Sequence, residues 1–239
     1  MVSALLLATA SPAQQGGALQ AQILYAYQTE DTNSLGNLIQ DLTVQVKADA
    51  GASLRYHMAH AQYRRGLLAG FENAREAEGA FAGCIDQLKP VLSQDVKSVE
   101  ALVLQSACYA GLANHRKIES VLLRARSDER LKAALKLAPH NPRAVFLSSM
   151  DGLRQAPPGT ALRQQGFTRL QLAVQLFDTS SATSVDTPGW GHAEAYLALG
   201  RELQARGDQL GARNWIEKSL IAAPDYKAAQ RQLTQLVSR

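Results

Sequence analysis

The sequence predicts an all-α protein built as an array of antiparallel helices, and three observations lead to this prediction. The chain is rich in Ala, Leu, Gln and Arg, which have high helix propensity, whereas Val, Ile and aromatic residues rarely form the alternating runs typical of strands. From Ala18 onward, apolar residues recur at the spacing of one helix face, interrupted at intervals by Gly, Pro, Asn or Asp. These interruptions are mostly short, so neighbouring helices are expected to lie antiparallel.

The interruptions divide the chain into about eleven helices. They are expected at residues 18–29, 33–48, 52–68, 72–93, 98–112, 115–137, 142–155, 161–177, 190–206, 209–222 and 225–237. Asn141 is expected to cap the helix that begins at Pro142, because proline in a first turn sacrifices no backbone hydrogen bond. Residues 178–189 are polar or β-branched, and they predict a surface loop, either a recognition loop or an inert insertion.

We expect residues 15–239 to form a single domain, because a stack of helices of this length needs no second hydrophobic core. Hydrophobic residues make up 46% of the chain and charged residues 19%, which is typical of folded globular proteins. No run approaches the roughly 18 apolar residues that cross a membrane. The sequence therefore predicts a folded array without a transmembrane segment.

The N-terminal residues 1–14 differ from the rest of the chain. Ala4–Ala8 is a short apolar core, and small residues of the kind signal peptidase accepts follow it, but no Lys or Arg precedes it. Two interpretations stay open for this segment, a possible cleaved signal peptide and a disordered N-terminus.

Charge and motif content do not indicate nucleic-acid binding or catalysis. The net charge is +4, and the eight basic against three acidic residues of 116–143 are interpreted as a solvated helix face. His57 and His60 are neighbours on one helix but lack the further ligands of a zinc site. Neither a nucleophile elbow nor a phosphate-binding loop occurs. We therefore expect no metal, no cofactor and no enzymatic activity.

A sequence repeat identifies the type of array. The 34 residues from Ala193 to Tyr226 contain, in order, Tyr196, Leu199, Gly200, Leu203, Gly207, Asp208, Ala212, Trp215, Ile216, Ser219 and Pro224. This order resembles the tetratricopeptide repeat (TPR), with Leu203 and Ser219 as mild departures from its pattern. A second unit within 98–142 aligns Ser106 with Gly200 and Tyr109 with Leu203. The resemblance implies a right-handed superhelical array of antiparallel helix pairs, with best repeats at 98–142 and 193–226.

The resemblance also implies a concave groove lined by the first helix of each pair. In the best repeat, the positions expected to face this groove are Glu194, Leu197, Arg201 and Gln204. Family members that clamp a peptide's terminal carboxylate use Lys and Asn where this chain has Leu197 and Arg201, which argues against such a clamp. The order of Asn141-Pro142-Arg143, a variable loop and Pro188-Gly189-Trp190-Gly191 resembles small exported bacterial repeat proteins.

One helix face and one cysteine pair are further candidates. Tyr56, His60 and Tyr63 share a face, where Tyr56 and Tyr63 either stack on a ligand or pack against the next helix. Cys84 and Cys108 would face each other at similar height in an antiparallel hairpin, since each lies about three turns from the connection near 93–97. A disulfide and a pair of buried free thiols both stay open here.

These observations favour a non-catalytic scaffold that binds a protein or peptide segment in its groove. Its expected location is the bacterial periplasm or the cell exterior, with the cytoplasm as the alternative. The second functional hypothesis is an accessory domain for an enzyme of envelope polymer assembly. The identity of the partner and the oligomeric state do not follow from the sequence.

Overall fold

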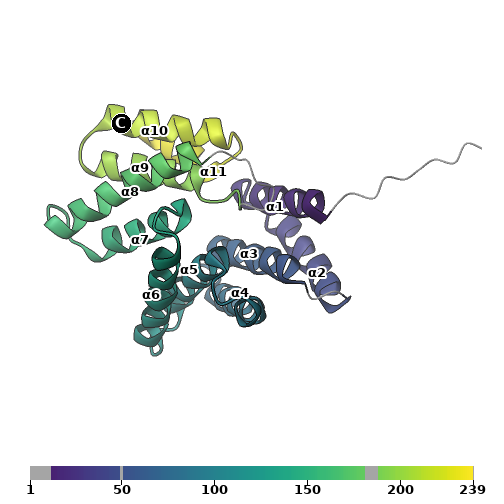
Figure 1. Cartoon of the computed structure of the whole chain (residues 1–239). Helices are drawn as coiled ribbons and strands as arrows, with labels where there is room; N and C mark the ends of the chain where they lie inside the picture. The colour runs from purple at the N-terminus through teal and green to yellow at the C-terminus, as the bar shows by residue number, and fades with distance from the viewer. Residues whose placement is uncertain (1–11, 49–50, 181–187, 239) are drawn as a thin grey trace, which may run out of the picture.

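The computed structural model describes residues 12–48, 51–180 and 188–238, and these ranges contain eleven α-helices and no β-strand (Figure 1). The prediction of an all-α array is confirmed. The helices are α1 (Pro12–Gln28), α2 (Thr32–Ala48), α3 (Ala52–Ala69), α4 (Ala74–Gln94), α5 (Val99–His115), α6 (Ser120–Leu137), α7 (Pro142–Gln155), α8 (Ala161–Thr179), α9 (His192–Ala205), α10 (Gln209–Ala222) and α11 (Lys227–Val237).

Side-chain caps fix several helix starts close to their predicted positions. The Asn141 side chain accepts a hydrogen bond from the backbone N–H of Ala144 at 3.0 Å, and α7 begins at Pro142 as expected. At α10, the Asp208 side chain accepts from the backbone N–H of Gly211 at 2.8 Å. Caps of this kind can be found from sequence because donor and acceptor lie three residues apart.

Several helix boundaries differ from the sequence prediction, and the differences at α1, α6 and α9 are the most informative. Helix α1 begins at Pro12 rather than 18, so the part of the 1–14 segment that is described belongs to a helix, and the rest lies outside the described residues. Helix α6 begins at Ser120 rather than 115 because α5 continues to His115. Helix α9 begins at His192 rather than 190, which leaves Trp190 outside the helix. Most of the expected 178–189 loop also lies outside the described residues.

The helices pack as antiparallel pairs that follow one another along the array. Helices α3 and α4, α5 and α6, α7 and α8, and α9 and α10 pack extensively against each other, and α11 covers α10 at the end (Figure 1). The first pair is an exception, because α1 and α2 each contact α3 more than they contact each other. Helix α1 therefore packs mainly on α3, and it lies toward the C-terminal part of the chain.

Small residues let paired helices approach closely. Gly200 of α9 and Ala212 of α10 meet at one such contact. In the longer α5–α6 pair, Ser106 occupies the position that aligns with Gly200. The Ser127 hydroxyl donates to the Ser106 carbonyl oxygen at 2.9 Å. Both serines are buried, so their hydrogen bond satisfies polar groups inside the pair. The extra residues of this unit lengthen both of its helices, to 17 and 18 residues against 14 each in α9 and α10.

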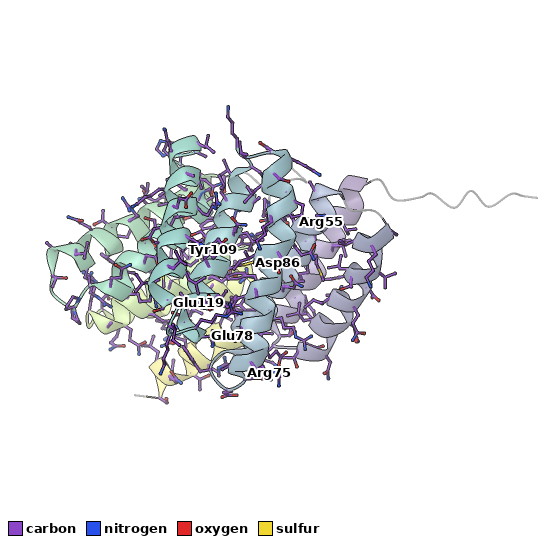
Figure 2. All side chains as sticks on the ribbon, turned by 90° about the horizontal axis from the view of Figure 1, so that it is seen from below. Arg55, Arg75, Glu78, Asp86, Tyr109 and Glu119 are labelled. Atoms are coloured by element: carbon purple, nitrogen blue, oxygen red, sulfur yellow. A yellow bond between two sulfur atoms is a disulfide. The ribbon has the colours of Figure 1, made fainter. Side chains whose placement is uncertain are left out.

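A disulfide links the second pair to the third. Cys84 of α4 and Cys108 of α5 are joined, with their Cα atoms 6.3 Å apart, and both side chains are buried in the apolar core. This distance lies within the range that disulfides span without backbone movement. Figure 2 shows the two helices with their side chains, seen from below the view of Figure 1, with Glu78 and Asp86 labelled on α4 and Tyr109 on α5.

Breaking the disulfide should destabilise the protein. The bond closes a segment with a sequence separation of 24, for which the chain-entropy model gives roughly 3.5 kcal/mol. We expect wild-type protein to lose stability in reductant during urea unfolding, whereas the variant with Cys84→Ser and Cys108→Ser should unfold identically with and without reductant. Two free thiols in denatured protein purified from its native host without reductant would contradict the bond.

The close contact at Gly200 predicts opposite effects for the same substitution at two glycines. A Cβ atom at Gly200 would lie 2.7 Å from Ile216 Cγ1 and 3.0 Å from the Ala212 carbonyl oxygen, so Gly200→Ala should destabilise by about 1–3 kcal/mol. The same added atom at Gly79 of α4 meets nothing within 4 Å, so Gly79→Ala should stabilise by up to about 1 kcal/mol. Urea unfolding of both variants measures the difference, and an unchanged or increased stability of Gly200→Ala would refute the close approach.

A candidate binding groove

A groove with a volume of about 730 Å³ follows the concave side of the array. Its lining residues come mainly from α3, α5, α7 and α9, the first helix of each of the four regular pairs. This is the surface that the repeat pattern predicts for ligand binding. The volume lies within the 300–1,000 Å³ that protein ligand sites commonly occupy.

The middle of the groove is apolar and has little side-chain bulk. Helix α5 contributes Ala107, Ala110 and Gly111, while α7 contributes larger apolar side chains that include Phe146 and Met150. Met150 is partly exposed to the groove, at 37% of its surface. Small side chains on one wall leave space for a ligand, and larger apolar ones on the next give it a surface to bury.

A buried ion pair lies at the floor of the groove. Arg64 Nη2 of α3 and Glu194 Oε1 of α9 are 2.6 Å apart, and only 2% of the Arg64 side chain is exposed. Arg64 Nε also donates to His60 Nε2 at 3.0 Å. Burial, followed by the charge of Arg64, lowers the pKa of His60 well below its usual value, so this histidine stays neutral and can accept that bond.

Aromatic rings surround the Arg64 guanidinium. Its central carbon lies 4.3 Å from the ring centroid of Tyr27 and 5.5 Å from those of Tyr63 and Trp190. These distances are typical of cation–π contacts, which are strongest where water is excluded. Trp190 also donates from Nε1 to the Tyr56 hydroxyl at 3.1 Å, which ties the segment before α9 to α3.

The tyrosines at this floor are held as neutral phenols. Burial raises the pKa of Tyr63 to about 12, with the Glu194 carboxylate among the smaller contributions in the same direction. Burial also raises the pKa of Tyr27 and of Tyr226. Near neutral pH these side chains can donate hydrogen bonds, but they do not supply phenolate for metal binding or proton abstraction.

The C-terminal end of α1 and the N-terminal part of α11 meet beside this cluster and bound the groove. The ring centroids of Tyr27 and Tyr226 are 6.0 Å apart, and Arg231 of α11 donates to both carboxylate oxygens of Glu30 at 2.6 and 2.8 Å. Glu30 has a φ of 54°, a left-handed conformation that is unfavourable for residues other than glycine. In Figure 1, α1 accordingly lies near α9 and α11.

A second buried ion pair holds the segment that carries Trp190. Arg143 donates from Nε and Nη2 to the Glu100 carboxylate, both at 2.7 Å, and from Nη1 to the Pro188 carbonyl oxygen at 2.6 Å. The sequence analysis counted Arg143 with the solvated residues of 116–143, and this was wrong, because only 4% of it is exposed. Its carboxylate partner lies 43 residues away in sequence, so local charge patterns cannot reveal the pair.

The predicted groove residues divide into two groups. Glu194, Leu197, Arg201 and Tyr63 line the groove. Gln204 does not line it, since its side chain accepts from Gln232 of α11 at 2.7 Å. Tyr56 also lies outside the lining; it packs against the apolar core and accepts a hydrogen bond from Trp190.

Sequence reasoning missed the two side chains at the centre of the floor, Arg64 and Trp190. Arginine is rarely buried in proteins, so its helical position alone predicts exposure. Trp190 had a usable signal, because it stands in a Pro-Gly-Trp-Gly run, where a large aromatic residue between turn formers indicates an anchored loop.

The described residues contain no group of three or more His, Cys, Asp or Glu side chains placed to hold a metal ion. Their helices also include none that is both long and apolar enough to cross a membrane. Apolar, hydrogen-bonding and charged side chains line the groove.

Comparison with known proteins identifies the architecture. No protein-family model and no curated protein matches the chain. A thermophilic TPR protein of Thermus thermophilus superimposes with a TM-score of 0.64 at 16% identity, over 95% of this chain and 100% of that one. The chain has a tetratricopeptide-like fold. The HusA haemophore from Porphyromonas gingivalis is also similar, with a TM-score of 0.65 at 19% identity, over 83% of this chain and 94% of that one.

Removing the charge of Glu194 should destabilise this tetratricopeptide-like fold strongly. Glu194→Gln leaves Arg64 buried without a counter-charge, and we expect the free energy of unfolding to fall by about 3 kcal/mol or more. Glu217→Gln is the matched control, because it breaks an exposed pair with Arg213 on α10, at 2.7 Å, and should change stability by less than about 1 kcal/mol. Equal effects of the two substitutions in urea unfolding would show that the floor does not depend on the buried pair.

Proposed function

We propose that this protein is a non-catalytic scaffold that holds a segment of a partner protein in its concave groove. The observation that carries the proposal is the groove itself, about 730 Å³ in volume, with apolar walls and both ends of the array closed around its floor. Helical-repeat proteins use such extended concave surfaces for binding. A segment that buries apolar side chains there would gain affinity from the hydrophobic effect.

The state of the ionisable groups supports a binding role over catalysis. Glu194 forms an ion pair with Arg64, and Tyr63 stays protonated because burial raises its pKa to about 12. A general base needs a pKa near the working pH and a place within reach of a substrate proton. Glu194 is paired with the buried Arg64 and Tyr63 stays protonated, so we propose positioning and packing as the roles of these side chains.

The cysteine pair supports a location in an oxidising compartment as part of this proposal. Cys84 and Cys108 are joined and buried, and disulfides persist mainly in the periplasm, the cell exterior and similar environments. We propose the bacterial envelope or the exterior as the place where the scaffold works. Its action as an accessory to an enzyme of the envelope is one form that such a role would take.

A second candidate function is the capture of a small, flat apolar molecule. The similar protein HusA is described as a haemophore, and here Tyr63, Phe146 and Trp190 are among the residues that line a groove of comparable size to small-molecule sites. Titration with haemin distinguishes this function: a saturable absorbance change at equimolar haemin would favour it over peptide binding.

Filling the groove should abolish binding of peptides selected against it. The ligand is represented by nonapeptides enriched from a randomised display library on the wild-type protein. We expect Ala110→Trp to weaken their binding at least tenfold in fluorescence anisotropy, because the indole occupies the space that Ala110 leaves at the wall. Ala125→Trp on the exposed face of α6 is the control and should bind normally.

Circular dichroism must show that both tryptophan variants are folded. Equal binding by Ala110→Trp and Ala125→Trp would place the peptide site outside the groove and overturn the proposed function. A library that yields no peptide dependent on Ala110 would do the same.

A further inference from the structure

The charges that line the groove are almost completely paired with one another. The lining includes four arginines and three carboxylates, which are Arg64, Arg154, Arg163, Arg201, Asp151, Glu194 and Glu202. Each carboxylate is matched within the lining, since Glu194 pairs with Arg64, Asp151 with Arg154 and Glu202 with Arg163, at 2.6 to 2.7 Å. One positive charge is left over.

The cation left over is Arg201 of α9. Its Nε donates to the side-chain oxygen of Gln232, a neutral group, at 2.9 Å, and within the described part of the chain it forms no ion pair. The neighbouring charges add to this positive excess, because the single carboxylate of Glu202 is shared between Arg163 and Arg206. This stretch of the groove therefore carries a net positive charge that its own carboxylates do not neutralise.

Arg201 stands within an apolar part of the wall. Leu197 and Ala198 precede it by four and three residues, and Ala205 follows it by four, so all three lie on the same helix face. All three line the groove with it. Leu197 is buried, with 2% of it exposed, so a ligand that reaches the Arg201 guanidinium meets apolar surface at Ala198 on one side and at Ala205 on the other.

We propose that the groove selects a partner segment in which apolar residues flank one acidic side chain, with the carboxylate placed on Arg201. This inference rests on the proposed function and specifies the class of ligand. The apolar flanks match the wall of α9, and the carboxylate supplies the one counter-charge that the groove lacks. A basic side chain at the same place would meet an unpaired guanidinium and is selected against.

Arg201 is exposed, so its charge acts mainly on selectivity. Exposed ion pairs add little affinity, but a like-charge contact is unfavourable and sorts ligands by sign. Gln232 holds the guanidinium from one side, and Gln232 in turn donates to Gln204. This chain of hydrogen bonds restricts the rotamers of Arg201, which lets the groove distinguish positions along a bound segment.

Reversal of this one charge tests the proposal. A randomised nonapeptide display library is selected on wild-type protein, on Arg201→Glu and on Arg75→Glu. Arg75 is the matched control because it is exposed on α4, outside the groove lining, and its reversal changes the net charge equally (Figure 2). Wild type and Arg75→Glu should enrich apolar peptides with one Asp or Glu, and Arg201→Glu should enrich peptides with Lys or Arg instead.

Affinities of individual peptides give the quantitative result. A selected acidic peptide should bind Arg201→Glu at least tenfold more weakly than it binds wild type. The same peptide with its acidic residue changed to Lys should bind Arg201→Glu at least fivefold more tightly than the acidic peptide does. Wild-type enrichment of neutral or basic peptides that still depend on Ala110 would overturn the ligand class while leaving the proposed function intact. Acidic peptides with equal affinity for wild type and Arg201→Glu would also overturn the assignment to Arg201.

Discussion

The buried contact between Arg64 and Glu194 is the constraint on which the architecture depends. Moving two charges out of water is unfavourable, and the pair is tolerable only because hydrogen bonds and aromatic rings replace the lost hydration. His60 accepts from Arg64, and Tyr27 and Trp190 lie over the guanidinium. These partners come from α1, α3 and the segment before α9, so the charge is satisfied only when those three parts of the chain meet.

This requirement changes the behaviour expected of a repeat array. Stacked repeats ordinarily touch only their neighbours, which makes their stability a sum of local terms. Here α3 is bonded to α9 across about half of the chain, and Glu30 near the first helix bonds Arg231 in the last. Contacts of such long range couple the two ends, so the array closes around its groove and the groove keeps a defined width.

The sequence was informative wherever the physical cause is local. Helix periods, the Asn141 cap and the Gly200 contact are set by residues within one repeat, and the structure agrees with those predictions. The repeat pattern also predicts that positions 197 and 201 face the groove, and Leu197 and Arg201 are among its lining residues.

Predictions became inaccurate where the cause is distant in sequence. Arg64 can be buried because Glu194 lies against it, and no residue within a helical turn of Arg64 indicates that this carboxylate is its partner. Gln204 turned away from the groove because α11 supplies Gln232, a contact between two helices that the repeat pattern does not specify. The start of α1 at Pro12 likewise follows no pattern that the repeat supplies.

The arrangement separates charges that hold the fold from a charge that is free to act on a ligand. Arg64 and Arg143 are buried with fixed carboxylate partners, so exchanging their counter-ions for those of a ligand would require the floor to open. Arg201 needs no such opening, since it is exposed and bonded only to a neutral amide among the described residues. Substitution of Arg201 is therefore expected to alter the proposed recognition without loss of the fold, whereas substitution of Arg64 is expected to destabilise the fold. Specificity in this array is thus expected to reside on the exposed turns of α9, with the closed floor as its fixed support.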